Sequence, residues 1–514
     1  MKDYEVTYYT IDQVRSEKLW DQLSYFDLIL IIGGITVPGK YVGGEPMSYN
    51  ELKKISEICR KKRRLLAGPF SSFQARKGGT KATNYQIDVD CVLGSDITTD
   101  LYNYLFDSQK NFNDWEILRS ASVLGAWIIK QHPRYPNIIC EIELSRGCER
   151  KSHCSFCVEP IFYPKLTSRP VKDVVDEITE LYKNGCRAFR FGRSANVLAY
   201  YFDIDGKPCP EVYEDLYQTI WQRCPKIDVL HHDNANPAFI TTHEKECIRI
   251  LETMVKWNTP GDVLSFGVES FDLKVVKMNN IMNSPQQVLR AIEIVNQIGR
   301  MRVDGVPKLL PGVNLLYGLI GETEQTYKEN FKWLKLILDR DLLLRRINIR
   351  QVIIEPGTPL YRFSQMKKLK LNREIFRSYK EKIRREIDLP MIQKVFPVGC
   401  ILRNVYPEYK EGKITFARQL GSYPVLTGVA GELADVSDVV VLDHGPRSIT
   451  AVKYPMNLNV ASFEELIHVP TIGERRAKKI ILARPFRSFE EVAQVLDNDQ
   501  ECLQVLRKIG AVVS

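Results

Sequence analysis

The chain has 514 residues, which favours roughly two to four domains, because a single hydrophobic core seldom grows beyond about 250–300 residues. Hydrophobic residues make up 44% and charged residues 26% of the sequence, as in a globular protein that buries a core. The net charge of +9 permits a nucleic-acid partner but does not by itself indicate one.

Membrane and export signals are absent from the sequence. The longest apolar run, around Leu28–Ile35, is much shorter than the roughly 20 residues of a membrane helix. The N-terminal segment MKDYEVTYYT has no apolar signal region. The 12 cysteines favour reduced thiols, as in other long cytosolic chains. We therefore expect a cytoplasmic protein without a membrane partner.

Residues 1–125 alternate short apolar strands with helical patterns. A strand at Phe26–Ile35 is followed by a helix at Ser48–Arg64 and by a second strand at Leu65–Pro69. This βαβ rhythm predicts a doubly wound, Rossmann/flavodoxin-like α/β domain. The segment contains no Gly-x-Gly-x-x-Gly fingerprint for a dinucleotide.

Residues 137–361 continue the alternation with longer helices, such as Val171–Asn184 and Pro210–Arg223. The repeated unit predicts an α/β domain built as a partial (β/α)6 TIM-like barrel, in which loops at the carboxyl ends of the strands carry the chemistry. The expected strands are Ile138–Leu144, Ala188–Gly192, Ile227–His231, Val263–Val268, Gly312–Tyr317 and Asn348–Ile354.

Three further segments follow the barrel. Residues 362–395 predict a basic helical connector, with eleven Lys and Arg against four Asp and Glu, or +7. Residues 396–455 combine short strands with Gly and Pro turns, which predicts a small C-terminal β-barrel of the OB type. Residues 456–514 are helical, and Ser462–Leu466 recurs as Ser488–Val492, each copy with the pattern of a capping box.

Three cysteines lie close together after the first barrel strand, at Cys148, Cys154 and Cys157. Three thiolates on one loop can bind three irons of a [4Fe–4S] cluster and leave the fourth iron open. A structural zinc site is the alternative, but it would need a fourth ligand, and His153 is crowded by Cys154. Another interpretation is that the three thiols are unrelated and bind no metal.

The segment around these cysteines resembles the radical SAM superfamily, and the similarity runs through residues 137–361. The resemblance implies that the cluster binds S-adenosylmethionine and cleaves it reductively. It also implies cofactor contacts at strand ends, namely Phe156, Gly192, Arg193, Glu269, Ser270, Asn314, Gly318, Gly321 and Val352. The sequence departs from the family at two places: five residues separate Cys148 from Cys154 where three are common, and the usual Gly-Gly-Glu is absent around Gly192.

The polar run His231–Asn234 ends the third expected strand. One interpretation is a cluster that faces the substrate and holds a proton donor. The other is a surface turn with satisfied side chains, because paired histidines at a strand end are not specific.

The C-terminal segments suggest the substrate. The small barrel is similar to a TRAM domain, which holds tRNA in the methylthiotransferase branch of the superfamily. Leu466–Ile481 is similar to a helix-hairpin-helix motif, although Thr471 stands where the motif has its first glycine. The motif implies phosphate contacts by Gly473, Arg475, Arg476, Lys478 and Lys479. A barrel that only caps the catalytic domain and a hairpin that only packs are the alternatives.

The whole arrangement resembles an archaeal-type group of radical SAM proteins with a C-terminal helix-hairpin-helix, and Ile35–Gly44 is typical of their N-terminal domain. We expect an enzyme that modifies a nucleic acid, with tRNA favoured over DNA, by methylthiolation, methylation or a related C–H functionalisation. An electron donor such as ferredoxin or flavodoxin would serve it. Methylthiolation is one candidate outcome, but that branch carries a second cluster on three N-terminal cysteines, and only Cys59 and Cys91 precede residue 125, which argues against two-cluster chemistry. The alternatives are an enzyme acting on a DNA lesion and a non-catalytic iron–sulfur protein that binds nucleic acid.

Overall fold

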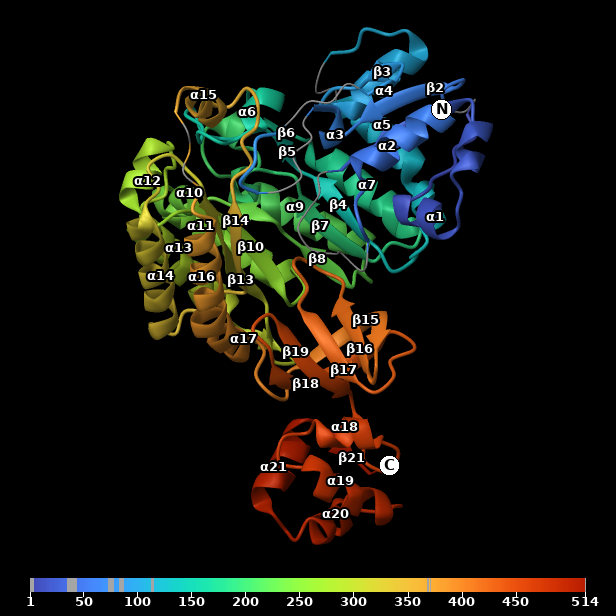
Figure 1. The fold of residues 1–514 in the computed structure, drawn as a ribbon, viewed down its shortest axis with the longest axis vertical. Helices are drawn as coiled ribbons and strands as arrows, with labels where there is room; N and C mark the ends of the chain where they lie inside the picture. Colours follow the sequence, from blue (N-terminus) through green and yellow to red (C-terminus); the bar gives the residue numbers. More distant parts are fainter. Residues whose placement is uncertain are drawn as a thin grey trace.

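The computed structural model describes residues 4–34, 44–72, 78–82, 87–111, 115–367, 369 and 371–513. The N-terminal unit and the large barrel lie side by side, with the small barrel beneath them and the helical lobe at the far end (Figure 1). The loop Ile35–Gly44 lies outside the described residues except for Gly44. No helix in the described segments is both long and apolar enough to cross a membrane.

The N-terminal unit is a parallel α/β structure, as its βαβ rhythm predicts. Three parallel strands pair in the order β1 (Leu28–Ile32), β2 (Arg63–Ala67) and β3 (Cys91–Val92). Between β1 and β2 runs α2 (Tyr49–Ile58), which begins with a capping box at Ser48. The other helices of this unit are α1 (Ile11–Ser16), α3 (Pro69–Ser72), α4 (Ile97–Phe106) and α5 (Trp115–Gly125).

The large barrel contains the six expected strands, all pairing in parallel. The described strands form two runs, β4-β7-β8 and β9-β10-β13-β14, which is the order of a partial barrel. Their bounds are β4 (Ile139–Glu143), β7 (Ala188–Gly192), β8 (Val229–His231), β9 (Asn234–Ala235), β10 (Asp262–Glu269), β13 (Leu309–Tyr317) and β14 (Arg346–Gln351). Strand periodicity therefore predicted the barrel to within a few residues at each strand.

Amphipathic helices cover the outside of these strands. In α7 (Val171–Lys183) the buried residues include Val174, Ile178 and Leu181, which share one helix face. The other covering helices are α9 (Pro210–Arg223), α11 (Glu244–Trp257), α13 (Pro285–Gly299) and α14 (Glu324–Asp339). Shorter elements connect them: α6 (Glu159–Phe162), α8 (Phe202–Asp205), α10 (Pro237–Thr242), α12 (Leu273–Met278), β5 (Ser145–Arg146), β6 (Thr167–Ser168), β11 (Arg302–Val303) and β12 (Val306–Pro307).

Alternation along the strands separates the two faces of the barrel wall. In β10, Phe266 and Val268 are fully buried in the main hydrophobic core, while Glu269 lies on the opposite face. In β7, Phe189 and Phe191 are buried in the same core, which leaves Arg190 on the other face. Arg190 and Glu269 therefore lie on the face of the barrel wall opposite this core.

A short segment of the N-terminal unit extends the barrel at its last strand. The Gly79 N–H donates to the Val352 carbonyl oxygen (2.7 Å), and the Ala82 N–H donates to the Ile354 carbonyl oxygen (3.0 Å). Lys81 forms a parallel bridge with Ile354. Residues 78–82 thus lie along the free edge beyond β14, where a six-stranded partial barrel would otherwise expose unpaired backbone groups.

The connector is helical, as predicted, and leads into a closed five-stranded barrel. It comprises α15 (Pro359–Met366), α16 (Arg373–Ile383), a π-helical turn (Arg384–Asp388) and α17 (Leu389–Val395). The barrel strands pair in the order β15-β16-β17-β19-β18 and close on themselves. They are β15 (Ile401–Glu411), β16 (Ile414–Gln419), β17 (Leu426–Ala430), β18 (Ser437–His444) and β19 (Ser448–Lys453).

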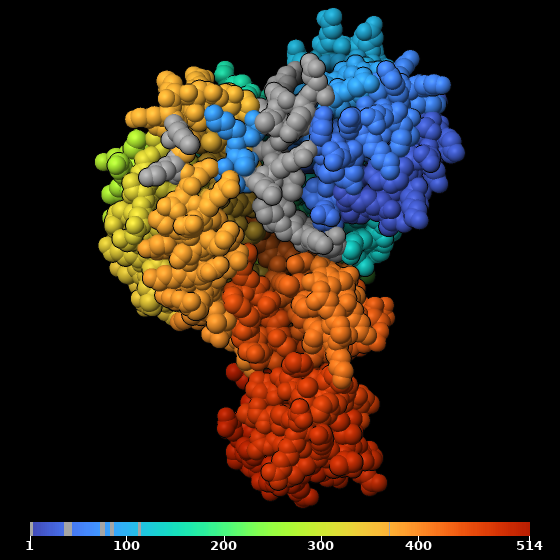
Figure 2. Space-filling view, viewed as in Figure 1, coloured from blue at the N-terminus to red at the C-terminus, as the bar shows by residue number. Residues whose placement is uncertain are grey.

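The helical lobe projects from the small barrel (Figure 2), and residues of both form one hydrophobic core. It contains α18 (Phe463–Ile467), α19 (Gly473–Leu482), α20 (Phe489–Val495) and α21 (Gln500–Lys508), with the strands β20 (Met456–Asn457) and β21 (Ala511–Val512). Ser462 forms the expected capping box with Glu465. The second expected capping box is wrong: Ser488 caps no backbone N–H, and Glu491 instead accepts from the Arg487 N–H (2.7 Å).

Candidate active site and nucleic-acid hairpin

The residues implicated in cluster and cofactor binding follow five strands of the large barrel at one edge. The cysteines follow β4, Gly192 ends β7, Glu269 ends β10, Gly318 follows β13 and Val352 follows β14. Because parallel strands bring their carboxyl ends to the same edge, residues from distant parts of the sequence gather there. Glu269 is close enough to Cys154 and Cys157 that its charge raises the pKa of both thiols, in addition to burial.

The cysteine loop is held by segments far away in the sequence. Ser155 donates its backbone N–H to the Asn279 carbonyl oxygen (2.9 Å) and its hydroxyl to Asn279 Oδ1 (2.7 Å). The Leu360 N–H donates to the Ser155 carbonyl oxygen (2.8 Å), which attaches the start of α15. At the other end of the loop, the Gly147 N–H donates to Glu159 Oε1 (2.9 Å). These bonds fix the loop backbone from both sides.

Two residues between Cys148 and Cys154, Glu149 and Arg150, take part in this attachment. Glu149 Oε1 accepts from Asn196 Nδ2 (3.0 Å) and from Asn236 Nδ2 (3.1 Å), beyond the ends of two neighbouring strands. Arg150 donates from Nη2 to the Asn280 carbonyl oxygen (2.6 Å) and from Nη1 to Cys154 Sγ (2.9 Å). The contacts of Glu149 and Arg150 are a physical role for this long spacing that sequence reasoning missed.

The three thiols are free and only partly exposed. Burial raises the pKa of Cys148 and Cys154, and it raises the pKa of Cys157 to about 12. Cys154 and Phe156 pack against an apolar cluster that includes Val352 and Leu360. The Arg150 guanidinium points at the Cys154 sulfur, where a thiolate would accept a stronger hydrogen bond than a thiol.

Within the described residues, no three His, Cys, Asp or Glu side chains converge as a metal-ligand group. The donor chemistry nevertheless fits an iron–sulfur cluster, because three free thiols lie on one anchored loop beside an apolar wall. Gly147 adopts φ +84°, and a Cβ at this position would meet the Lys165 carbonyl oxygen. The tight turn just before Cys148 therefore requires glycine.

At the end of β7, Gly192 provides close contact and Arg193 turns the chain. A Cβ on Gly192 would overlap the Glu141 carboxylate, so only glycine lets that side chain cross the strand. Arg193 adopts φ +62°, donates to Tyr163 Oη (3.2 Å) and lies 3.8 Å from Glu143 Oε1. The side chain of Arg193 thus joins the acidic end of β4 rather than projecting freely.

Glu269 and Ser270, although adjacent, have different surroundings. Burial raises the pKa of Glu269 to about 7, and the positive charge of Arg350 opposes that shift. Ser270 is 1% exposed; its hydroxyl contacts Asn330 Oδ1 at 3.4 Å and accepts from the Asp272 N–H (3.1 Å). Ser270 therefore joins the end of β10 to α14, which contains Asn330. Glu269 is the residue at this strand end whose pKa is shifted toward neutrality, as is common in functional sites.

The remaining predicted contacts lie on β13 and β14. Asn314 sits within β13 and bonds to Ser265 Oγ (3.0 Å) and to Asn348 Nδ2 (3.1 Å), so it belongs to a polar row across three strands. A Cβ on Gly318 would meet Leu371 at 2.5 Å, and a Cβ on Gly321 would meet Met278 Sδ at 2.5 Å. Both glycines therefore permit close packing at this edge, and both have positive φ.

The polar run His231–Asn234 forms a buried junction with the small barrel and is not a surface turn. The Ser422 N–H donates to His231 Nδ1 (2.9 Å), and the Tyr423 hydroxyl donates to Asp233 Oδ1 (2.6 Å). His232 points away from the barrel interior, between Asp262 and Tyr217. Sequence reasoning missed this insertion, because Ser422 and Tyr423 carry no motif.

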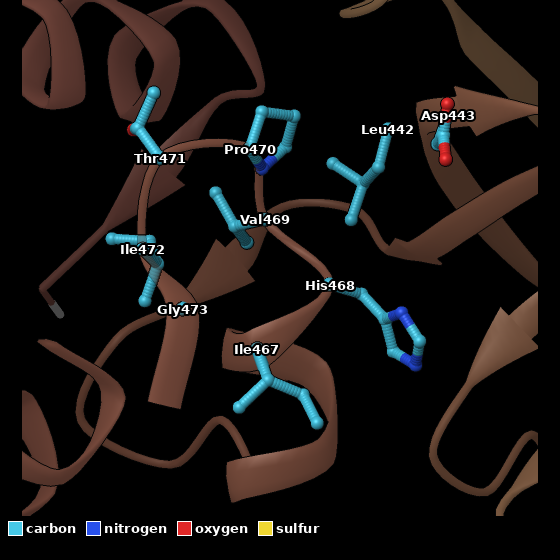
Figure 3. A pocket seen from close by; sticks show the side chains of 9 residues that line it. All are labelled: Leu442, Asp443, Ile467, His468, Val469, Pro470, Thr471, Ile472 and Gly473. Atoms are coloured by element: carbon cyan, nitrogen blue, oxygen red, sulfur yellow. The ribbon is translucent and has the colours of Figure 1, made fainter. Parts of the chain in front are cut away.

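The hairpin of the helical lobe lines a cavity of about 540 Å³ against the small barrel. Figure 3 shows the hairpin residues Val469–Gly473 on one side of it and Leu442 and Asp443 of β18 on the other. Thr471 adopts φ +74°, so the backbone keeps the glycine-like conformation of the motif despite a β-branched residue. The Thr471 hydroxyl is buried, and it has no hydrogen-bond partner among the described residues.

The basic side chains of the hairpin are mostly paired. Arg476 bonds to Asp499 and to the Thr471 carbonyl oxygen, and Lys479 lies 2.8 Å from Asp497. Lys478 is 3.9 Å from Glu474, on the same helix. Gly473 begins α19, whose first turn has no side-chain cap. The N–H groups of that turn, together with Arg475, are the parts of the motif that are open to an anion.

Two family models match parts of this chain, and two archaeal proteins match nearly all of it. The radical SAM superfamily matches residues 142–334, and a helix-hairpin-helix motif matches residues 453–508. An uncharacterized protein of Archaeoglobus fulgidus is 38% identical over 96% of this chain and 90% of its own length. One of Methanocaldococcus jannaschii is 40% identical over 87% of this chain and 86% of its own length.

More distant similarity covers the catalytic part alone. A tRNA-2-methylthio-N(6)-dimethylallyladenosine synthase of Buchnera aphidicola is 28% identical over 38% of this chain and 41% of that protein. Among solved structures, the cobalamin-dependent S-adenosylmethionine radical enzyme OxsB aligns with 72% of this chain and 50% of that chain, at TM-score 0.42 and 12% identity. That structural similarity is too low to add to the assignment.

Enzymes of the matched superfamily use a [4Fe–4S] cluster and S-adenosylmethionine, which agrees with the donor chemistry of the cysteine loop. The match runs from the end of β4 into α14 and stops before β14, and the two archaeal relatives extend the similarity over nearly the whole chain. The chain therefore belongs to the radical SAM superfamily, as an archaeal-type member with a C-terminal helix-hairpin-helix motif.

Proposed function

We propose that this radical SAM enzyme modifies a nucleic acid, with tRNA favoured over DNA as the substrate. Cys148, Cys154 and Cys157 would hold the cluster, and Arg150 would stabilise the thiolate of Cys154. When bound, the cluster and S-adenosylmethionine supply one-electron reductive cleavage, which activates otherwise unreactive C–H bonds. The observation that carries the proposal is a cysteine loop of this kind in one chain with a helix-hairpin-helix lobe.

The pocket for S-adenosylmethionine would lie at the same edge of the barrel. Phe156 and Val352 belong to one apolar cluster that could accept the adenine face. Polar and backbone contacts would come from Glu269, Gly192 and Arg193. The absence of side chains at Gly318 and Gly321 would let the backbone approach the cofactor. Ser270 and Asn314 would act indirectly, because each is already engaged in the wall.

The position of the hairpin supports an extended substrate. The loop before α6 and the hairpin before α19 lie near opposite ends of the molecule (Figure 1). A small metabolite cannot contact both, whereas a folded RNA or a duplex can. The closed five-stranded barrel lies between the two, where it would contact the phosphate backbone without reading sequence. The similarity to a tRNA methylthio-adenosine synthase favours tRNA, with methylthiolation or methylation as candidate outcomes.

The test starts with anaerobic reconstitution of the full chain with iron and sulfide. Incubation with S-adenosylmethionine and dithionite, and in parallel with a reduced flavodoxin or ferredoxin, should yield 5′-deoxyadenosine. Bulk tRNA should stimulate this yield, and mass spectrometry of its nucleosides should reveal a new modification.

Other outcomes of the same experiment distinguish the alternatives. Stimulation by damaged duplex DNA and not by tRNA would favour a DNA lesion as the substrate. About four irons per chain without any 5′-deoxyadenosine would indicate a structural or sensing cluster. Product formation that no nucleic acid stimulates would contradict the proposed substrate class.

A further inference from the structure

A cavity of about 380 Å³ lies where the basic connector meets the small barrel, well away from the cysteine loop. Figure 1 shows α16 running along the side of the large barrel toward α17, close to β18 and β19. The cavity is lined by Glu381, Arg384, Arg385, Leu389, Pro446 and Arg447. Its volume is at the small end of the range for ligand sites in proteins.

The connector presents its arginines to the cavity through a local change of helix type. Residues Arg384–Asp388 form a π-helical turn between α16 and α17, and the Leu389 N–H donates to the Arg384 carbonyl oxygen. Such turns insert a residue into a helix and occur frequently at functional sites. On the opposite wall, Arg447 projects from the tight turn between β18 and β19, where the Gly445 N–H donates to the Ser448 carbonyl oxygen (2.8 Å).

Two of the three arginines form no direct ion pair in the part of the chain that the structure describes. Arg385 pairs with Glu386 at 2.8 Å. Arg384 and Arg447 form neither an ion pair nor a side-chain hydrogen bond with any described residue. Glu381 and Asp388 are the nearby acidic groups: both act on Arg384 through charge, and Asp388 interacts with Arg447 in the same way.

Further cations lie close by and repel one another. Arg447 is near enough that its charge, added to burial, lowers the pKa of Arg384, of Lys380 and of Arg345, the last to about 9. Arg345 Nε is buried without a hydrogen-bond partner in the described residues, as is Asp388 Oδ2. Crowded cations cost free energy, most of all where they are partly buried as Arg384 and Arg345 are, and a bound anion would recover part of that cost.

We infer that the cavity formed by Arg384, Arg385 and Arg447 binds a phosphate group. Guanidinium groups pair with phosphate oxygens in a bidentate geometry, and two of them on facing walls would hold one phosphate between them. The source of the phosphate rests on the proposed function: in a nucleic acid it is a backbone phosphodiester, and otherwise it belongs to a free phosphorylated ligand. The binding chemistry is the same in both cases.

The first experiment measures binding of inorganic phosphate to the reconstituted full-length protein by calorimetry. The double variant Arg384→Gln/Arg447→Gln should bind phosphate at least about tenfold more weakly, because it loses two charge-assisted contacts. A matched control, Arg249→Gln/Arg290→Gln, removes the same charge from the outer helices α11 and α13 and should bind like the wild type. Equal phosphate affinity in all three proteins, or no binding to the wild type, would overturn the inference.

A second measurement identifies the source of the phosphate. If the ligand is a nucleic-acid backbone, tRNA should compete with phosphate in the wild type. The double variant should then show a shallower dependence of log affinity on log salt, by about 1.4–1.8 for two lost contacts. Phosphate binding that tRNA does not displace would keep the site and contradict the RNA substrate.

Two controls separate this site from the radical chemistry and from folding. Unstimulated 5′-deoxyadenosine formation should be the same in the double variant and the wild type, because the cavity is remote from the cysteine loop. If the double variant unfolds early in a thermal melt, Arg447→Gln alone serves instead, because Arg447 is exposed on a turn. A single variant with wild-type phosphate affinity would then contradict the inference.

Discussion

The cysteine loop and the hairpin are both motif-bearing loops, but the chain satisfies their polar groups in opposite ways. Around Cys154 the partners come from distant segments: Asn279 and Asn280 lie more than a hundred residues from the loop. In the hairpin the partners are mainly local acids, such as Asp497 and Asp499 beside Lys479 and Arg476. The first loop is partly buried and anchored by distant segments, and the basic side chains of the second are largely neutralised by its own lobe.

This difference shows that a count of charged residues does not give the charge available to a ligand. The hairpin has four basic residues from Arg475 to Lys479, yet three of them pair with acids. The cavity at the connector has only three arginines, and two of them are unpaired in the described chain. Ion pairs on the surface contribute little stability, so their main effect in the hairpin is to reduce its positive potential.

The largest expected effect is the loss of Cys154. Cys154→Ala removes a proposed ligand from an otherwise anchored loop, so iron content should fall and 5′-deoxyadenosine should drop to background. Iron analysis and product quantification after anaerobic reconstitution check this. Cys91→Ala, in the N-terminal sheet, is the control and should retain both. Wild-type product from Cys154→Ala would remove the basis for the cluster assignment.

Replacement of Arg150 should have the next largest effect, because it removes a neighbour of a ligand rather than a ligand. We expect Arg150→Ala to lower cluster occupancy or activity by about 10- to 100-fold, which is typical when a group that orients a metal ligand is lost. The electron paramagnetic resonance spectrum of the reduced cluster should shift. Arg150→Lys should retain part of the cluster occupancy and activity. A spectrum and yield identical to the wild type in Arg150→Ala would show that the contact is only structural.

Removal of the hairpin's acids should unmask its positive charge. In Asp497→Asn/Asp499→Asn, Lys479 and Arg476 lose their partners, so RNA affinity at low salt should rise by roughly 3- to 10-fold with a steeper salt dependence. Filter binding across a salt series measures both. A matched double variant, Glu211→Gln/Glu244→Gln, frees arginines on the outer helices and should have a smaller effect. No gain in affinity would exclude the hairpin from the RNA contact.

The smallest expected effect is the relief of backbone strain at Thr471. A non-glycine residue in the left-handed region costs about 1–2 kcal/mol. Glycine removes that strain but costs about 0.5–1 kcal/mol, because its unfolded chain has more conformational entropy to lose. Thr471→Gly should therefore raise the free energy of unfolding by up to about 1 kcal/mol, as measured by urea denaturation. Gly473→Ala is the converse control and should destabilise, because Gly473 adopts φ +58°. A loss of stability in Thr471→Gly would mean that the side chain makes a compensating contact.

Local pattern was sufficient to predict the elements that build the site. Strands such as Ala188–Gly192 and helices such as Pro210–Arg223 agree with their expected bounds, because periodicity and capping act within a few residues. The cysteine loop was predictable for a similar reason, since its three thiols are spaced by the chain itself. The superfamily match over residues 142–334 confirms the kind of enzyme that this spacing indicated.

The interior of the site could not be predicted in the same way. Ser270 follows β10 and Asn314 lies within β13, and their side chains bond to Asn330 and to Ser265, which local pattern did not predict. The insertion of Tyr423 against Asp233 joins segments 190 residues apart and carries no motif. Such contacts depend on how the domains dock, which local propensity does not encode.

The sequence by itself determined the superfamily, because the three cysteines after a strand and the residues up to α14 match its pattern. It also determined the order of the domains, since each has its own periodicity. The tertiary structure decided which charges are free: Arg476 and Lys479 are neutralised by residues of the same lobe, while Arg384 and Arg447 face each other unpaired across a domain joint. The physical reason is that electrostatic interaction depends on distance and burial, which only the folded chain sets.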